Sequence, residues 1–460
     1  MARQREHWGS RLGFIMATAG SAIGLGSLWK FPYVTGDNGG GLFVLVYVLF
    51  TFIVGVPIFM AELLLGRGSQ LSPVGTFTSW AHNRPRWKLL GWTSVLASFI
   101  IISYYCVVAG WAVNYTLMSI NQFMDGREPG QIRELFDILY RSGDVNVLWF
   151  GLFLLMTIGV VYGGIRKGIE YWAKILTPAL LILLVALFIY GTTLDGFGEA
   201  FRFVFYPDAS KLSPSGILKA LGLSFFTLSV GMGILITYGS YMKSSESLPG
   251  TACIVASMTV GVSLLSALMI FPIIFSFGFS PELGPGLLFK TMPVLFAKMP
   301  GALVLSSAFF ILVVFTALTS SISILEVLVA TLMELKAWSR RKAIVICGCA
   351  LFVFGLPSAL AGSGDLFASW SQIFGKNFFD TMDQLCDTWL LPLNGLLVAV
   401  FAGWAVDAER RRTEFSKGTT SYWFYRPWLF SVRWIVPIAI LLVILNQTGI
   451  INIDLLWNKL

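Results

Sequence analysis

Residues 20–32 read GSAIGLGSLWKFP, and the three glycines Gly20, Gly24 and Gly26 fall within seven positions of this apolar stretch. Glycine permits φ values that end a helix. Within lipid, unpaired backbone groups are tolerated only where they line a cavity. The stretch therefore predicts a helix that is interrupted inside a membrane. Freed N–H groups on one side of the break favour an anion, and freed carbonyls on the other side favour a cation.

The composition agrees with a membrane protein. Of the 460 residues, 56% are hydrophobic and 12% are charged, about half the charged fraction of a soluble chain. Apolar runs of roughly twenty residues recur along the whole sequence, which predicts an all-α integral membrane fold. We expect about eleven spans, near residues 11–34, 41–66, 88–122, 147–163, 170–191, 217–240, 250–279, 300–334, 343–361, 384–406 and 428–449.

Polar intervals between these spans do not exceed about 30 residues, so we expect residues 1–460 to form a single transmembrane domain. Alternate loops are basic, for example 336–342 and 410–417, whereas 125–144 is rich in acids. By the positive-inside rule the N-terminus is cytoplasmic and the C-terminus lies outside. The N-terminal segment lacks the pattern of a signal peptide. The net charge of +8 is explained by this topology, and no nucleic-acid partner is expected.

Enzymatic and metal chemistry find little support. The five cysteines contain no C-x-x-C pair, and the chain has two histidines. A zinc site and histidine-based nucleophilic catalysis are therefore not expected. Since no nucleotide motif is found either, the sequence predicts that the protein is not an enzyme.

A second interrupted segment is found five spans after the first. Residues 225–241 read FFTLSVGMGILITYGSY, with Gly231 and Gly233 preceded by Thr227 and Ser229. Because an offset of five spans is odd, the two halves have opposite topology, so we expect inverted repeats near 10–191 and 217–406 and an additional helix at 428–449. Glycines also allow close helix packing. The matching positions and the adjacent hydroxyls favour a binding site.

A third polar stretch, TALTSSIS at 316–323, lies within the eighth expected span. Its hydroxyls could bond back to their own helix. Alternatively, several hydroxyl oxygens could bind a hard monovalent cation. The stretch alone does not decide between these two interpretations.

Five stretches together resemble the neurotransmitter:sodium symporter family, in the bacterial branch that includes the leucine transporter. They are REHWGSRLGFIMATAGSAIGLGSLWKFP (5–32), NGGGLFVLVY (38–47), SYYCVVAGW (103–111), FFTLSVGMGILITYGSY (225–241) and LTSSIS (318–323). The resemblance implies an inverted five-helix repeat with discontinuous first and sixth helices. It also implies sodium-coupled symport of an apolar or aromatic amino acid by alternating access, in a bacterial inner membrane.

The resemblance further implies a substrate site between the two breaks. N–H groups around Leu25 and Gly26 would hold a carboxylate, with Tyr105 as a further donor, while carbonyls of both breaks would receive an ammonium group. Met232 could admit a large side chain because methionine is flexible, or it could simply fill volume. The implied substrate residues are Ala22, Leu25, Gly26, Ile101, Tyr105, Phe226, Thr227, Ser229, Met232, Ser320 and Ile324.

Two sodium sites belong to the family pattern. The residues of the second site are all present. This site uses the carbonyls of Gly20, Ile23 and Thr316 and the hydroxyls of Thr319 and Ser320. We therefore expect one sodium ion there.

The first sodium site departs from the pattern. It would use Ala22, Ser27, Thr227 and Thr259, but Ser27 and Thr259 stand where relatives have longer amide or carboxylate ligands. We expect this site to be weak or lost.

Chloride dependence is left open by the sequence. Leu223 replaces a glutamine that relatives place near the anion, while Tyr47, Thr227 and Ser263 could still contribute hydroxyls.

The family gates are also implied. Arg5 with Glu334 would form the cytoplasmic ion pair, with Trp8 and Tyr241 beside it.

On the outer side, Lys30 would pair with Asp383, and Tyr104 with Phe226 would cover the substrate. Glu62 would have a structural role by satisfying unwound backbone.

Three alternatives remain at this stage. The altered first sodium site could mark a transporter of the same fold that is coupled to protons or uncoupled. The solute could be a non-standard amino acid or a related small molecule. A solute sensor is less favoured because the sequence has no signalling domain. In every case the expected partners are a small molecule and the lipid bilayer.

Overall fold

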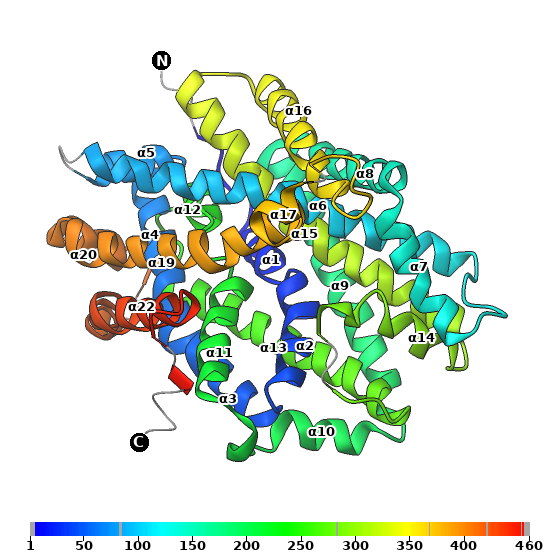
Figure 1. Ribbon diagram of the computed structural model, residues 1–460. Coiled ribbons are helices and arrows are strands. Elements are labelled where there is room, and N and C mark those ends of the chain that lie inside the picture. Colours follow the sequence, from blue (N-terminus) through cyan, green and yellow to red (C-terminus); the bar gives the residue numbers. More distant parts are fainter. Residues whose placement is uncertain are drawn as a thin grey trace.

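The computed structural model describes residues 5–81, 85–281, 284–367, 369–419, 422–451 and 453–454, and every regular element in these residues is a helix (Figure 1). Nine segments of this part are long and apolar enough to cross a membrane. They are Gly41–Ser69, Lys88–Ile120, Gly143–Tyr162, Ile165–Thr192, Leu248–Ser276, Ala302–Lys336, Arg340–Ala359, Trp370–Ala405 and Tyr422–Gln447.

The long or central helices within these segments are α3 (Gly41–Phe50), α4 (Val56–Ser69), α6 (Lys88–Ile120), α8 (Gly143–Tyr162), α9 (Tyr171–Thr192), α13 (Leu248–Ser276), α15 (Ala302–Lys336), α16 (Arg340–Ala359), α19 (Leu391–Val400) and α22 (Val436–Gln447). Shorter helices are α5 (Pro73–Trp80), α7 (Pro129–Arg141), α10 (Phe197–Phe205), α14 (Thr291–Ala297), α17 (Trp370–Phe374), α18 (Phe378–Gln384), α20 (Ala408–Ser416) and α21 (Tyr425–Phe430).

Two further segments are broken. The first joins α1 (Arg11–Ala22) to the π-helical turn η1 (Gly26–Lys30) and α2 (Phe31–Asp37), with a bend of 50°. The second joins α11 (Pro214–Thr227) to α12 (Ile234–Gly239) through residues 228–233. Nine unbroken segments and the first broken one make ten in the described residues that are long and apolar enough to cross a membrane. The second broken segment lies where the sequence predicts the sixth of about eleven spans.

Local chemistry explains both breaks. Ser10 caps the start of α1 by accepting a hydrogen bond from the N–H of Gly13 at 3.0 Å. At the second break Gly231 and Gly233 have φ of +84° and +75°, in the left-handed region that glycine adopts without strain. The breaks are therefore encoded by the residues that occupy them.

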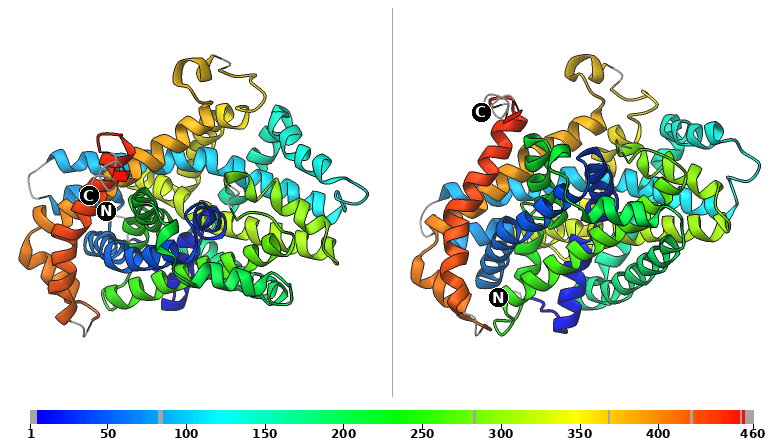
Figure 2. Two further views of the ribbon diagram at one scale, coloured as in Figure 1. Left: turned by 60° about the horizontal axis from the view of Figure 1, so that its bottom comes forward. Right: turned by 90° about the horizontal axis from the view of Figure 1, so that it is seen from below.

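The broken segments lie at the centre of the molecule. Figures 1 and 2 show α1 and α2 surrounded by other helices, while α22 lies at the periphery. The two longest helices, α6 and α15, pack against each other, and α1 packs on α15. This arrangement brings the glycine-rich breaks and the hydroxyl-rich stretch of α15 together.

One expected boundary was wrong. The tenth span begins at Trp370, well before residue 384. Polar residues such as Asp380 and Asp383 lower the hydropathy of the start of this segment, and short helices α17 and α18 precede its apolar part.

Candidate functional site

The first break leaves several backbone groups without helical partners. The N–H of Ile23 still bonds to the carbonyl of Ala19 at 2.7 Å. Among the described residues, no backbone carbonyl accepts from the N–H groups of Gly24, Leu25 and Gly26. These are the free donors that begin the second half of the segment. An anion placed against them would meet a preformed set of donors.

The second break is held by side chains of three other helices. Glu62 is fully buried in α4, and its Oε1 accepts from the N–H of Gly231 at 2.7 Å. Asn394 of α19 donates to the carbonyl of Gly231 at 2.9 Å, and Ser98 of α6 donates to the carbonyl of Met232 at 2.6 Å. These bonds satisfy backbone groups that the missing helical turn leaves unpaired.

A cavity of about 200 Å³ lies between the two breaks. All the substrate residues expected from the sequence line it except Thr227, whose hydroxyl is instead 3.0 Å from the hydroxyl of Tyr47. The Tyr105 hydroxyl is buried and has no hydrogen-bond partner among the described residues. A Cβ on Gly24 would lie 2.7 Å from Ser320 Oγ and 3.7 Å from this hydroxyl. Both hydroxyls thus converge on the free N–H groups.

Sequence reasoning missed several lining residues. Trp29 and Tyr33 share a helical face with Gly26, since they follow it at three and seven positions, so this spacing could have identified them. Phe379 and Asp380 gave no such signal, because they precede the expected start of their span. The missed lining residues are Ser21, Gly24, Trp29, Tyr33, Val108, Ile234, Phe379 and Asp380.

Gly20, Thr319 and Ser320, three of the residues expected for the second sodium site, lie where α1 packs on α15. A Cβ on Gly20 would lie 3.2 Å from Thr319 Cβ. Thr319 Oγ1 donates to the carbonyl of Thr316 at 3.0 Å, and Ser320 Oγ donates to the carbonyl of Ser21 at 3.1 Å. Each hydroxyl thereby keeps its lone pairs available. The part of the chain that the structure describes holds no group of three His, Cys, Asp or Glu side chains that could bind a metal. Neutral hydroxyl and carbonyl oxygens suit a hard monovalent cation.

The residues expected for the first sodium site differ in their bonding. Ser27 Oγ is fully buried and has no partner among the described residues, whereas Thr259 Oγ1 bonds back to the carbonyl of Val255 at 2.9 Å. Ala22 and Thr227 are also buried nearby in the two broken segments. Thr259 thus donates within its own helix, as Thr319 does, so this bond alone does not distinguish the two expected sodium sites.

The residues that could hold chloride are gathered in one place. The Tyr47 hydroxyl lies 3.0 Å from Thr227 Oγ1 and 3.3 Å from Ser263 Oγ, and Ser263 in turn donates to the carbonyl of Thr259 at 3.0 Å. Leu223 is buried and brings no hydrogen-bond donor. These hydroxyls therefore satisfy one another.

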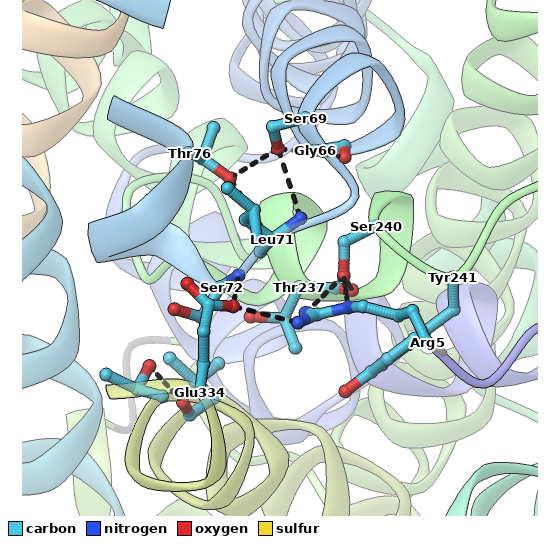
Figure 3. Close-up of polar contacts among 12 residues, drawn as sticks. Arg5, Gly66, Ser69, Leu71, Ser72, Thr76, Thr237, Ser240, Tyr241 and Glu334 are labelled. Atoms are coloured by element: carbon cyan, nitrogen blue, oxygen red, sulfur yellow. Dashed lines mark hydrogen bonds and ion pairs between the residues drawn. The ribbon is translucent and has the colours of Figure 1, made fainter. Parts of the chain in front are cut away.

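A polar cluster joins the N-terminal segment to α12 and α15, and we call Arg5, Trp8, Ser240, Tyr241 and Glu334 the Arg5 cluster. Figure 3 shows Arg5, Ser240, Tyr241 and Glu334 of this cluster. Arg5 forms an ion pair with Glu334 at 2.9 Å and donates twice to Ser240 Oγ, at 2.6 and 3.1 Å. Its guanidinium lies 4.9 Å from the ring centre of Tyr241. Trp8 is buried against the same helix end and donates to the carbonyl of Tyr238 at 3.1 Å.

Residues 6–10 form a strap across the start of the segment that contains α9. Glu6 accepts from the N–H of Ile165 at 3.0 Å. Glu170 accepts from the N–H of Gly9 at 2.6 Å and from the hydroxyl of Ser10 at 2.8 Å. This strap could not be predicted from the sequence, because its bonds join distant segments and two of them use backbone N–H groups.

Glu326 and Arg340 extend the cluster and were also missed. Glu326 is fully buried in α15, accepts from the Tyr241 hydroxyl at 2.7 Å and pairs with Arg340 at 2.6 Å. A fully buried acid within an apolar helix is a recognisable signal of a partner.

We expect Arg5→Ala to open this end of the molecule, since it removes three polar bonds at once. In a background with the exposed Cys253 and Cys349 replaced by serine, a cysteine at the buried Thr237 should react with a charged maleimide at least about 10-fold faster, because losing bonds worth about 1.5 kcal/mol or more shifts the equilibrium tenfold. Arg5→Lys is the control and should retain most protection. Equal labelling rates with Arg5 and with alanine would contradict the expectation.

Lys30, Tyr104, Phe226 and Asp383 line the cavity, and Asp387 pairs with Lys30; we call these five residues the Lys30 cluster. Lys30 forms its ion pair with Asp387, so the expected pairing with Asp383 was wrong. Asp383 and Asp387 are one helical turn apart on the same face, so a lysine could pair with either of them. The Lys30 ammonium pairs with Asp387 and lies 4.2 Å from the ring centre of Phe226. Asp383 itself lines the cavity with Lys30, Tyr104 and Phe226.

Comparisons with known proteins agree with this geometry. A family model described as "Sodium:neurotransmitter symporter family" matches residues 5–128 and 130–456. The chain is 36% identical over 454 residues to an uncharacterized sodium-dependent transporter, YhdH, of Bacillus subtilis (strain 168), which covers 98% of this chain and 100% of that one. It is 33% identical over 456 residues to an uncharacterized sodium-dependent transporter of Haemophilus influenzae, with 97% and 98% covered. The crystal structure of MhsT in complex with L-phenylalanine matches with a TM-score of 0.87 and 41% identity, covering 96% of this chain and 100% of that chain.

Proposed function

We propose, from the premise that this chain belongs to the sodium:neurotransmitter symporter family, that it couples the inward movement of an apolar or aromatic amino acid to sodium. One observation carries this proposal most directly. A cavity of about 200 Å³ presents free N–H groups of a broken helix to a carboxylate, and the hydroxyls of Thr319 and Ser320 lie against the same break.

The substrate would be oriented by the backbone. Its carboxylate would accept from the N–H groups around Leu25 and Gly26 and from the unpartnered Tyr105 hydroxyl. Its ammonium would face carbonyls of the two breaks, and its side chain would lie against Ile101 and Met232. The neighbouring structure of MhsT holds L-phenylalanine, which supports an amino acid of this size.

One sodium ion would bind where Gly20, Ile23, Thr316, Thr319 and Ser320 meet. When bound, the ion would attract oxygen atoms of both the first broken segment and α15, and it would thereby stabilise the packing of α1 against α15. The first site would be weak, because the short hydroxyls of Ser27 and Thr259 stand where the family pattern has longer amide or carboxylate ligands. A membrane potential contributes about 2.3 kcal/mol per charge per 100 mV, so even one ion can drive accumulation.

The protein would lie in a bacterial inner membrane with the Arg5 cluster on the cytoplasmic side. The basic loops support this orientation. With the Arg5 cluster closed, the cavity would be reached from outside past the Lys30 cluster. The repeat boundaries near 10–191 and 217–406, with the extra helix at 428–449, remain a prediction.

The proposal is tested by uptake into proteoliposomes. Labelled Trp, Tyr, Phe, Leu and Met are offered with an inward sodium gradient, and with equimolar potassium or choline at the same pH. Sodium-driven accumulation of at least one of them is expected. Uptake that is indifferent to sodium would favour proton-coupled or uncoupled transport, and no uptake of any of them would contradict an amino acid substrate of this class.

A further inference from the structure

Two aromatic rings of the Lys30 cluster line the cavity together with a third ring, and the three come from three different helices. Phe226 comes from α11, Tyr104 from α6 and Phe379 from α18. The rings of Tyr104 and Phe379 meet edge to face, with centres 5.5 Å apart and planes at 75°. Such tilted contacts are the favoured geometry of aromatic pairs. Phe379 thus shares the position of the two lid residues expected from the sequence.

The ring of Phe379 is supported from behind by Trp111. Their ring centres are 5.9 Å apart, and Trp111 is almost fully buried. Trp111 also packs against Phe136 of α7 and against Phe289, with ring centres 5.2 and 5.8 Å apart. Trp111 therefore fills the space between the lid and the short helix α7.

A buried asparagine fixes the orientation of Trp111. The indole N–H donates to Asn146 Oδ1 at 2.8 Å, and the amide of Asn146 donates to the carbonyls of Leu139 and Tyr140 at 3.0 Å each. These carbonyls belong to the last turn of α7, where the Leu139 carbonyl also accepts from the N–H of Ser142 at 3.0 Å. Every donor of the Asn146 amide is used, so the indole can take one orientation.

The helix that carries Phe379 is attached to α7 at a second point. Asn377 caps α18 by accepting from the N–H of Asp380 at 2.8 Å, and it donates to the Tyr140 hydroxyl at 3.1 Å. The position of Phe379 relative to α7 is therefore fixed twice, through the packing of its ring on Trp111 and through the bond of Asn377 to Tyr140.

We propose that Phe379 is a third lid residue, which contacts the bound amino acid and favours aromatic side chains, and that Trp111 and Asn146 are its positioning residues. This inference rests on the proposed function, since it names a specificity determinant of the same site. A flat ring in this position offers an aromatic substrate a contact that an aliphatic side chain does not match. Removing it should weaken binding by the value of one aromatic contact, roughly 3- to 10-fold.

The test is equilibrium binding of labelled L-phenylalanine and L-leucine to the purified full-length protein in sodium buffer. Phe379→Leu should raise the Kd for phenylalanine by about 3- to 10-fold and the Kd for leucine by less than about 2-fold. Phe379→Tyr should preserve both affinities. Wild-type binding of neither amino acid would refute the proposed function, whereas wild-type binding with equal losses for both ligands, or with none, in Phe379→Leu would refute this inference alone.

The positioning role is tested by a double-mutant cycle. Trp111→Phe keeps a ring but loses the N–H donor, and it should raise the phenylalanine Kd severalfold in the presence of Phe379. In the Phe379→Leu background the same change should have no further effect, because residues that act through one contact are not additive. Additive losses would show that Trp111 acts on binding independently of Phe379 and would refute the positioning role. Phe136→Leu, which alters a contact of Trp111 away from the cavity, is the matched control and should leave phenylalanine selectivity unchanged.

Discussion

Thr319→Ala combined with Ser320→Ala is expected to lower sodium-driven uptake at least about 100-fold. Two of the five proposed oxygen ligands are lost, and a bond to a charged group contributes about 1.5–3 kcal/mol. Two such losses total about 3–6 kcal/mol, which exceeds a hundredfold in binding. The measurement is initial uptake of the preferred amino acid into proteoliposomes as a function of sodium concentration.

A matched control lies on the same helix. Thr331 is also fully buried in α15, and its hydroxyl bonds back to Val327 at 2.7 Å. Thr331→Ala should therefore retain sodium dependence close to wild type. If the double variant still concentrates substrate with an unchanged sodium requirement, the ion binds elsewhere.

Glu62→Leu is expected to produce the largest loss of stability among single changes near the site. It leaves the N–H of Gly231 buried without its acceptor, which costs about 1–3 kcal/mol for a neutral partner and more for a charged one. The second break should lose its fixed shape. Transport should fall below about a tenth of wild type, and thermal unfolding in detergent should shift to lower temperature.

Glu62→Gln distinguishes the hydrogen-bond acceptor of Glu62 from its negative charge, because it keeps the first and removes the second. Its amide oxygen can still accept from Gly231, so this variant should fold nearly as well as wild type and keep part of the transport. A glutamine variant as unstable as the leucine variant would show that the charge, rather than the hydrogen bond, is what the break requires.

The sequence could predict the parts of the site that depend on local chemistry. Glycines at 20–26 and 231–233 break their helices because of their own backbone freedom, and apolar runs of sufficient length cross a membrane wherever they occur. The lining residues of the first break follow from helical spacing once the break is placed. For these reasons the first and sixth helices were predicted correctly.

Other features depend on how distant segments are aligned. Asp383 and Asp387 lie on one helical face, and only the position of that helix along its axis decides which of them Lys30 reaches. Phe379 and Trp111 meet through helices that are far apart in the sequence, with Asn146 from a third one. Such contacts leave no local pattern in the sequence, because each of these residues is by itself an ordinary apolar or polar side chain.

The strap formed by residues 6–10 also bears on the kinetics of the carrier. Its bonds reach Ile165, Glu170 and, through Trp8, the carbonyl of Tyr238, and the adjacent Arg5 binds Glu334 and Ser240. Because these contacts lie along one short stretch of backbone, breaking any one of them does not free the others. Release at this end should be an all-or-none event with a large activation enthalpy. In the proposed orientation this release follows substrate binding, so uptake should become steeply temperature-dependent while substrate binding changes little.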